Sequence, residues 1–257
     1  MTATDKVLFD RDGTVAIVTL NRPDQRNAID AETGNLLRRT FDDIERDDSL
    51  RVAVLAASGT IFCAGMDLKA FVNGEAEDIL FGAGRLGGFV SRDRTKPVIA
   101  AVQGAALAGG FELVLACDMV VAARHAQFGL PEARLGLVAG AGGAFRLGQL
   151  LPRALANEIV LTGAAFDAAR AMGWGLVNRL TGDDPKPEAL ALARQIAENA
   201  PLSITASLAL ARAADARVDE ACWAENDRQL RRMISSHDAE EGARAFAEKR
   251  PPVWTGR

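Results

Sequence analysis

The chain has 257 residues, of which 49% are hydrophobic and 25% are charged, an ordinary balance for a globular protein with a sizeable core. Its net charge of −4 argues against a nucleic acid or a membrane surface as the main partner. The three cysteines form no C-x-x-C pair, the two histidines lie far apart, and no apolar run approaches the ~20 residues of a membrane span. We therefore expect a cytoplasmic protein without a metal site, because the N-terminus also lacks a signal-peptide pattern.

Strand and helix patterns alternate through the first half of the chain. Residues 30–47 have apolar side chains at helical spacing. The segments that read as strands are β-branched or continuously apolar: Val15–Leu20, Val52–Ala56, Val98–Val102 and Met119–Ala122. Continuous apolar strands separated by helices predict an α/β fold whose sheet is covered on both faces.

Helical periodicity dominates from about Pro185, and no further strand pattern follows. We divide the chain into a core of residues 1–184 and a helical region of residues 185–257. Asp238, with Glu241 three residues later, predicts a capping box at the start of the last helix, which Pro251 and Pro252 would end. Since these helices have no further strands to cover, we expect their apolar faces to pack on another subunit.

Two glutamates stand in unexpected surroundings. Glu112 interrupts an apolar run directly after Gly109 and Gly110, and Glu132 follows Pro131. A carboxylate among core residues costs several kcal/mol unless it is paired or has a shifted pKa, and two that share a pocket can divide acid and base work. Each also has a structural alternative: an ion pair with an arginine for Glu112, and a helix start for Glu132.

Two predicted strands run into glycine-bearing loops, 62–69 and 104–110, and the second leads into the helix that carries Glu112. Glycines let backbone N–H groups approach a ligand closely, and the first N–H groups of a helix have no intrahelical partner. The two loops would therefore form an oxyanion hole if they lay side by side; the alternative is two tight turns. A G-x-G-x-x-G match at residues 82–87 follows no strand pattern, so we do not expect a dinucleotide site.

Several segments, taken in order, resemble the enoyl-CoA hydratase/isomerase (crotonase) superfamily along nearly the whole chain. They are residues 21–28 (NRPDQRNA), 62–69 (FCAGMDLK), 104–112 (GAALAGGFE), 128–132 (FGLPE), 140–143 (GAGG) and 246–250 (FAEKR). Two positions depart from the family's usual pattern: Ala108 replaces a glycine, and Ala139 replaces a proline. The resemblance implies a spiral of ββα repeats with a C-terminal helical trimerisation region, and trimers that pair into hexamers.

The resemblance also implies a hydro-lyase that adds water, reversibly and syn, to a 2-enoyl-CoA thioester. Glu112 and Glu132, 20 positions apart as in hydratases, would be the catalytic pair, and the N–H groups of Met66 and Gly109 the oxyanion hole. Glu132 would protonate the α-carbon and Glu112 would activate the water. No metal or cofactor is implied, since coenzyme A belongs to the substrate. The residues expected to contact substrate or coenzyme A are Arg26, Ala28, Ala64, Asp67, Leu68, Lys69, Gly140, Phe246 and Lys249.

A finer resemblance concerns the substrate. Five segments look like carnitinyl-CoA dehydratases, which run the same chemistry on an acyl chain with a quaternary ammonium group: residues 74–78, 81–84, 87–89, 109–113 and 174–178. Such a cation favours aromatic faces, and this chain has no tyrosine and 5% aromatic residues. We therefore place a general hydratase first and a carnitinyl-CoA dehydratase second. A non-catalytic binding protein of the same fold is the alternative of another class.

Overall fold

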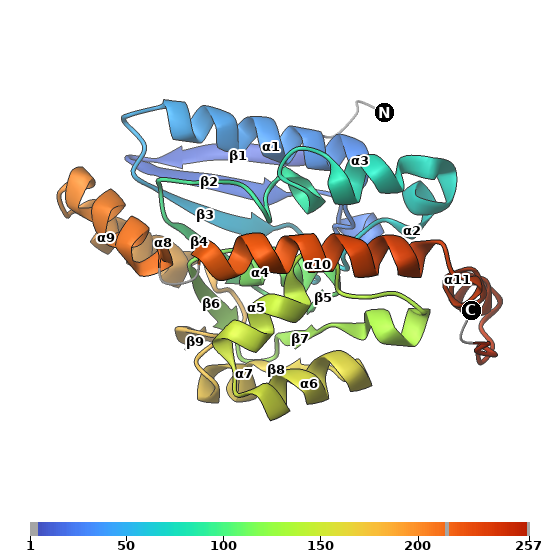
Figure 1. The fold of residues 1–257 in the computed structure, drawn as a ribbon. Helices are drawn as coiled ribbons and strands as arrows, with labels where there is room; N and C mark the ends of the chain where they lie inside the picture. Colours follow the sequence, from blue (N-terminus) through green and yellow to red (C-terminus); the bar gives the residue numbers. More distant parts are fainter. Residues whose placement is uncertain (1–4, 214–215, 256–257) are drawn as a thin grey trace.

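The computed structural model describes residues 5–213 and 216–255 (Figure 1). Residues 1–4, which belong to the N-terminus predicted to lack a signal-peptide pattern, lie outside this range. The elements in chain order are β1 (Val7–Asp12), β2 (Val15–Leu20), η1 (Pro23–Gln25), α1 (Ala31–Arg46), β3 (Val52–Ala57), α2 (Leu68–Ala70), η2 (Phe71–Glu75), α3 (Ala76–Phe81), η3 (Leu86–Gly88), β4 (Val98–Val102), β5 (Ala106–Leu107), α4 (Gly109–Leu115), β6 (Met119–Ala123), β7 (Gln127–Gly129), η4 (Pro131–Leu135), α5 (Gly143–Leu150), α6 (Arg153–Thr162), β8 (Phe166–Asp167), α7 (Ala168–Gly173), β9 (Arg179–Thr181), α8 (Lys186–Ala197), α9 (Pro201–Ala213), α10 (Ala216–Ile234) and α11 (His237–Glu248).

The main sheet has the strand order β1-β2-β3-β4-β6-β9, in which only β1 pairs antiparallel. Its register places Ile17, Val54 and Ile99 in one row across three strands. The four strands predicted from apolar runs are all present, each ending within one residue of the predicted position. The helix predicted over residues 30–47 is also present, capped by Asp30, whose side chain accepts a hydrogen bond from the N–H of Thr33.

A second, smaller sheet explains the spiral. β5 pairs parallel with β7, and β7 pairs antiparallel with β8. Single parallel bridges, Ile29 with Met66 and Cys63 with Ala106, join the earlier loops to it. Successive turns of the chain thus contribute one strand to the main sheet, a short segment to the small sheet, and then a helix, as in β4-β5-α4.

Hydrophobic side chains bury both faces of the main sheet. On one face they form the large core with α1, α4 and the small sheet; on the other they pack against α8. Ala189, Ala193 and Ala197 lie four residues apart along α8 and are buried on this second face. The expectation that helices beyond Pro185 have no strands to cover is therefore wrong for α8, which completes the core of its own chain.

The remaining C-terminal helices lie along the surface of the same chain: α10 crosses in front of α4 and α5, and α11 lies at one end (Figure 1). The predicted capping box is wrong, because Ser236 caps α11 by accepting a hydrogen bond from the N–H of Ala239. Glu241 instead binds Arg250 and the N–H of Val253. α11 ends at Glu248, before the two prolines. Within the described ranges, no helix is long and apolar enough to cross a membrane.

Candidate active site

Three successive turns of the spiral bring the predicted site residues together. Met66 follows the bridge at Cys63, Gly109 follows β5, and Glu132 follows β7. Because β5 and β7 are parallel and the bridge at Cys63 is parallel to β5, these residues leave the small sheet in the same direction. The spiral, rather than any local motif, therefore brings residues from three separate stretches of the chain to one side of the small sheet.

The two glycine-bearing loops lie side by side. A Cβ built on Gly65 would lie 2.8 Å from the nitrogen of Gly109, and a Cβ built on Gly109 would lie 3.4 Å from the nitrogen of Met66. Gly109 is the first residue of α4, where an N–H group has no intrahelical partner. Neither the Met66 nor the Gly109 N–H donates a backbone hydrogen bond within the described chain. The predicted proximity of the two loops is confirmed, and their N–H groups can serve one oxygen.

Ala108 adopts a backbone conformation that favours glycine. Its φ is 51° and its ψ is −130°, in a region where an L-residue stores of order 1–3 kcal/mol of strain. This is the position at which the sequence departs from the glycine triplet of the family. Hydrogen bonds hold the segment in place, since the N–H of Ala108 donates to Gly129 and that of Glu112 donates to Ala108.

Glu112 is 3% exposed, and its Oε1 accepts hydrogen bonds from the N–H groups of Ala141 at 2.8 Å and Gly143 at 2.7 Å. Burial raises its pKa to about 7, although these two donors and the charge of Arg146 act in the opposite direction. A Cβ on Gly143 would lie 2.8 Å from the Cγ of Glu112, so only glycine fits there. The carboxyl group is thus held in one orientation with a pKa suited to a general base.

Glu132 is 8% exposed, and its Oε2 is buried without a hydrogen-bond partner among the described residues. Burial first, and then the charge of Glu112, raises its pKa well above the usual value. Since the charge of Glu112 acts on the pKa of Glu132, the two carboxyl groups lie near one another. Glu132 also lies in the first turn of the 3₁₀ helix η4, directly after Pro131, so the helix-start interpretation is confirmed and is compatible with a role in the site.

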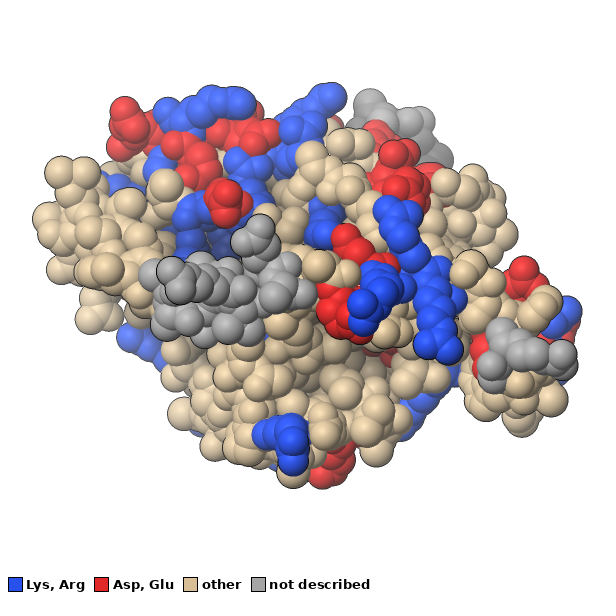
Figure 2. Space-filling view, viewed as in Figure 1, with Lys and Arg blue, Asp and Glu red and all other residues tan. Residues whose placement is uncertain are grey.

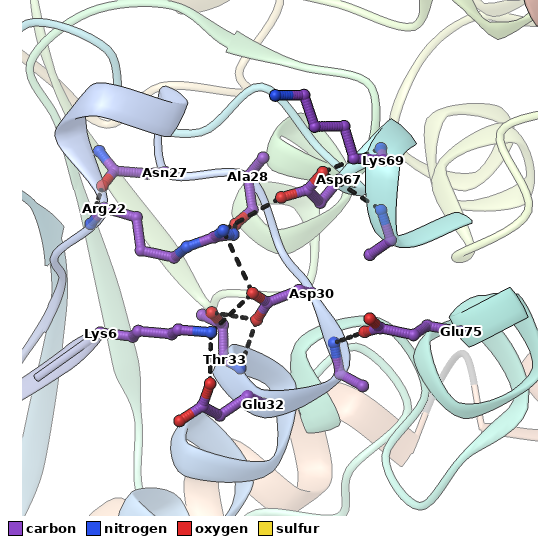
Figure 3. Close-up of polar contacts among 12 residues, drawn as sticks. Lys6, Arg22, Asn27, Ala28, Asp30, Glu32, Thr33, Asp67, Lys69 and Glu75 are labelled. Carbon is purple, nitrogen blue, oxygen red and sulfur yellow. Dashed lines mark hydrogen bonds and ion pairs between the residues drawn. The ribbon is translucent and has the colours of Figure 1, made fainter. Parts of the chain in front are cut away.

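A polar network joins the glycine-bearing loop 62–69, called the oxyanion loop below, to the N-terminal segment (Figure 3). Arg22 donates to the carbonyl of Ala28 at 2.5 Å and to Asp67 at 3.1 Å, and it lies 3.2 Å from Asp30. Asp67 caps α2 by accepting from the N–H groups of Lys69 and Ala70. The carboxylate of Asp67, the residue after Met66, thus binds groups of its own chain. Its contact with coenzyme A stays a prediction.

The other residues predicted to contact substrate fall into four groups. Ala64 belongs to the glycine-bearing loop 62–69, and Ala28 lies in the segment next to it, where the N–H of Ala64 donates to the carbonyl of Arg26. The side chains of Arg26 and Lys69 are exposed, and Leu68 is half-buried beside them. Gly140 begins the loop whose next residues hold Glu112. Phe246, 60% exposed, lies on α11, and the exposed Lys249 directly follows its end; nothing within this single chain tests their approach to a ligand.

The sequence did not reveal the contacts that orient Glu112. The donors of Ala141 and Gly143 are backbone groups and leave no side-chain signal; only the glycines of this loop indicated a close approach. Asn226 of α10 donates to the carbonyl of Gly140 at 2.7 Å. Its position on a charged helix gave no sign of this contact.

Comparison with known proteins decides the family. The family model described as enoyl-CoA hydratase/isomerase matches residues 10–257. The chain belongs to the enoyl-CoA hydratase/isomerase family. It is 44% identical to a carnitinyl-CoA dehydratase of Citrobacter koseri, over 97% of this chain and 98% of the relative.

Solved structures of this family have the same fold. The crystal structure of a carnitinyl-CoA hydratase from Mycobacterium avium matches with a TM-score of 0.94 and 42% identity, over 99% of this chain and 100% of the other. An enoyl-CoA hydratase from Mycobacterium tuberculosis H37Rv matches with a TM-score of 0.78 and 44% identity, with the same coverage. The predicted crotonase-like fold is confirmed, and the chain is an enzyme of the hydro-lyase type.

Proposed function

We propose that this enzyme adds water reversibly to the double bond of a 2-enoyl-CoA thioester and gives the 3-hydroxyacyl-CoA. Two observations support the proposal: two buried glutamates near enough for the charge of one to act on the other, and a pair of neighbouring backbone N–H groups, one of them at the start of the helix that carries Glu112, without backbone partners in the described chain. The N–H groups of Met66 and Gly109 suit the thioester oxygen. The negative charge that builds there during addition would be stabilised by ~2.7–4 kcal/mol per donor.

The surroundings of the two glutamates support different roles for them. Glu112, with two N–H donors and a pKa of about 7, is the better base, and Glu132, whose pKa is raised further by the charge of Glu112, keeps a proton. Glu112 takes a proton from water while the oxygen bonds to the β-carbon, and the electron pair of the double bond moves towards the thioester. Glu132 then gives its proton to the α-carbon. The pair ends with one proton, as it began, so no metal or cofactor is required.

A second candidate is the same chemistry on a carnitinyl-CoA substrate, which the names of the relatives from Citrobacter koseri and Mycobacterium avium favour. An aromatic pair, Trp223 and Phe145, does lie beside Gly142. However, the ring of Trp223 already faces Arg85 at 4.2 Å and Arg146 at 5.4 Å from its centroid. A quaternary ammonium group would gain little from a ring that already faces two guanidinium groups, which keeps the general hydratase first.

The substrate is tested by comparing kcat/KM for crotonyl-CoA and crotonobetainyl-CoA with the purified enzyme. We expect hydration of crotonyl-CoA and poor acceptance of the cationic thioester. A much higher kcat/KM for crotonobetainyl-CoA would identify the enzyme as a carnitinyl-CoA dehydratase. No turnover of any enoyl-CoA, with binding retained, would favour a non-catalytic binding protein.

We also infer that the enzyme works in the cytoplasm as a trimer or a dimer of trimers, with Phe246 and Lys249 reaching the coenzyme A site of a neighbouring subunit. Their exposure, on α11 for Phe246 and just after its end for Lys249, leaves them available for this. The apolar side chains of Leu202 and Leu210 on α9 are 85% and 76% exposed, as expected of a helix that packs on another subunit. Light scattering tests the assembly.

A further inference from the structure

Helix α10 has two faces of different character. Its outer face carries the surface ion pairs Glu225–Arg228 and Arg231–Glu77, and Figure 2 shows acidic and basic side chains together along this helix. A stripe on the opposite side faces the protein: Trp223, Asn226, Asp227 and Leu230, spaced three and four apart. The residues of this inner stripe contact both halves of the active site.

The first contact supports Glu112 from behind. The Nδ2 of Asn226 donates to the carbonyl of Gly140 at 2.7 Å, and Leu230 packs so closely that a Cβ on Gly140 would lie 2.6 Å from its Cδ2. The chain then turns, and the N–H groups of the next residues, Ala141 and Gly143, bind Oε1 of Glu112. One amide on α10 therefore fixes the backbone that orients the proposed base.

The second contact supports the oxyanion hole. Asp227 accepts two hydrogen bonds from Arg85, at 2.5 and 2.7 Å. Arg85 has φ 56° and ψ −147°, a conformation that costs a non-glycine residue energy and that the ion pair helps to hold. The next residue, Leu86, is 1% exposed and packs directly on Gly109, where an added Cβ would lie 2.4 Å from its Cδ2. Asp227 thereby restrains the position of the Gly109 N–H group.

We propose that the adjacent residues Asn226 and Asp227 are a positioning pair, which aligns the Glu112 carboxyl through Gly140 and the Gly109 N–H through Arg85 and Leu86. The proposal rests on the proposed function, because it assigns the pair to that same site. Neither side chain takes part in the reaction. The charged groups that face Glu112 are Glu132 from η4 and Arg146 from α5, and neither is altered in the variants below.

The two halves of the pair predict different effects. Asn226→Leu keeps the size of the side chain but removes the donor to Gly140, so the N–H groups on Glu112 loosen and its ionised form is less stable. We expect kcat to fall about tenfold or more, and the acid limb of the kcat–pH profile to move up by about half a unit, roughly a threefold change in ionisation. Asp227→Asn removes the ion pair with Arg85, so kcat should fall without that shift.

Controls separate positioning from general damage. Asn226→Gln retains an amide donor and should restore part of kcat and the wild-type pH profile. Gln229→Ala, at a position whose side chain binds Glu225 of the outer face, should change neither. Circular dichroism checks folding, and Asn226→Ala replaces the leucine variant if that variant does not fold.

A readout without turnover separates this proposal from the proposed function. Carbon-13 NMR of glutamate carboxyl groups, with Glu112→Gln for assignment, follows the titration of Glu112 directly. A higher titration midpoint in Asn226→Leu supports the positioning role even if the wild type hydrates no enoyl-CoA. Two results overturn the proposal. One is an unchanged Glu112 midpoint in an Asn226→Leu variant that keeps the wild-type kcat; the other is an unchanged midpoint in this variant when the wild type itself has no turnover.

Discussion

Glu112 accepts two backbone N–H groups, whereas the Oε2 of Glu132 is buried without a partner among the described residues. Both glutamates were recognised in the sequence because a carboxylate in an apolar run requires an explanation. The division of their roles was not derivable from their neighbours in sequence. It depends on donors 29 and 31 positions after Glu112 and on the proximity of the two carboxyl groups.

Burial of Glu112 predicts a stability that falls with pH. Its folded pKa of about 7 lies above the ordinary 4.5, so its contribution is fully present below pH 4.5 and is lost as pH rises through 7. The shift corresponds to about 3 kcal/mol. Urea unfolding should therefore show that the free energy of unfolding of Glu112→Gln, relative to that of the wild type, is higher at pH 8 than at pH 5 by about this amount. A stability difference that is the same at both pH values would contradict the buried, proton-binding state.

The proposed oxyanion hole consists of backbone groups, which predicts opposite outcomes for its two residues. Met66→Ala keeps the N–H group and should change kcat only severalfold. Gly109→Pro removes a donor and should reduce kcat by ~10²–10³-fold. Proline is tolerated in the first turn of a helix, but its Cβ would meet the Cδ2 of Leu86 at 2.4 Å, so circular dichroism and urea unfolding must show a folded protein before the loss is assigned to the missing donor. A fully active Gly109→Pro enzyme would exclude this donor.

At the scale of the elements, the apolar runs predicted the central strands because a strand buried on both faces has no polar alternation. The short strands β5, β7 and β8 have two or three residues each and gave no pattern long enough to detect. Their pairing nevertheless aligns the site. The glycine loops indicated where backbone approaches closely, but the partner of each loop follows only from the spiral.

Arg22 links the N-terminal segment to the oxyanion loop, and its loss is predicted to impair both activity and stability. Arg22→Gln leaves Asp67 without its ion pair next to Met66. We expect kcat to fall about tenfold or more, since small misplacements cost up to about 10²-fold, and stability to fall by about 1–3 kcal/mol. Steady-state kinetics and urea unfolding measure both.

The matched control for this variant is Arg11→Gln, whose guanidinium pairs with Asp47 at the surface. It should change stability by no more than about 0.5 kcal/mol and leave kcat unchanged. Equal effects of the two substitutions would mean that Arg22 is merely one more surface charge.

At the scale of the whole molecule, α11 packs against its own chain, in addition to any contact with a neighbouring subunit. A Cβ on Gly242 would lie 2.2 Å from the carbonyl oxygen of Leu135, and one on Gly136 would lie 2.4 Å from that of Asp238. The helix therefore packs without clearance against η4, which begins at Pro131 and carries Glu132. Deleting residues 238–257 would remove this support as well as any contact between subunits.

Gly242→Val should separate α11 from η4, lower thermal stability and reduce kcat, because it forces a side chain into a backbone contact. Ala247→Val, on the exposed side of the same helix, adds similar bulk and should leave both quantities nearly unchanged. Thermal unfolding and turnover compare the two. Equal behaviour of the pair would show that the contact with η4 does not support the site.

Lys249 tests the contribution of a neighbouring subunit without disturbing that contact. Lys249→Ala should raise KM for the thioester, increasingly at low salt where the charge on the coenzyme A phosphates is less screened, and should leave the particle size unchanged. An unchanged KM at low salt would remove Lys249 from the coenzyme A site.

The most direct measurement is the rate of crotonyl-CoA hydration by the wild type, Glu112→Gln and Glu132→Gln, each checked by circular dichroism. Both substitutions keep the shape of the side chain and remove the proton transfer, so each folded variant should lose at least ~10²-fold in kcat while the wild type turns over. Near-wild-type turnover in either variant would contradict the mechanism of two cooperating carboxyl groups.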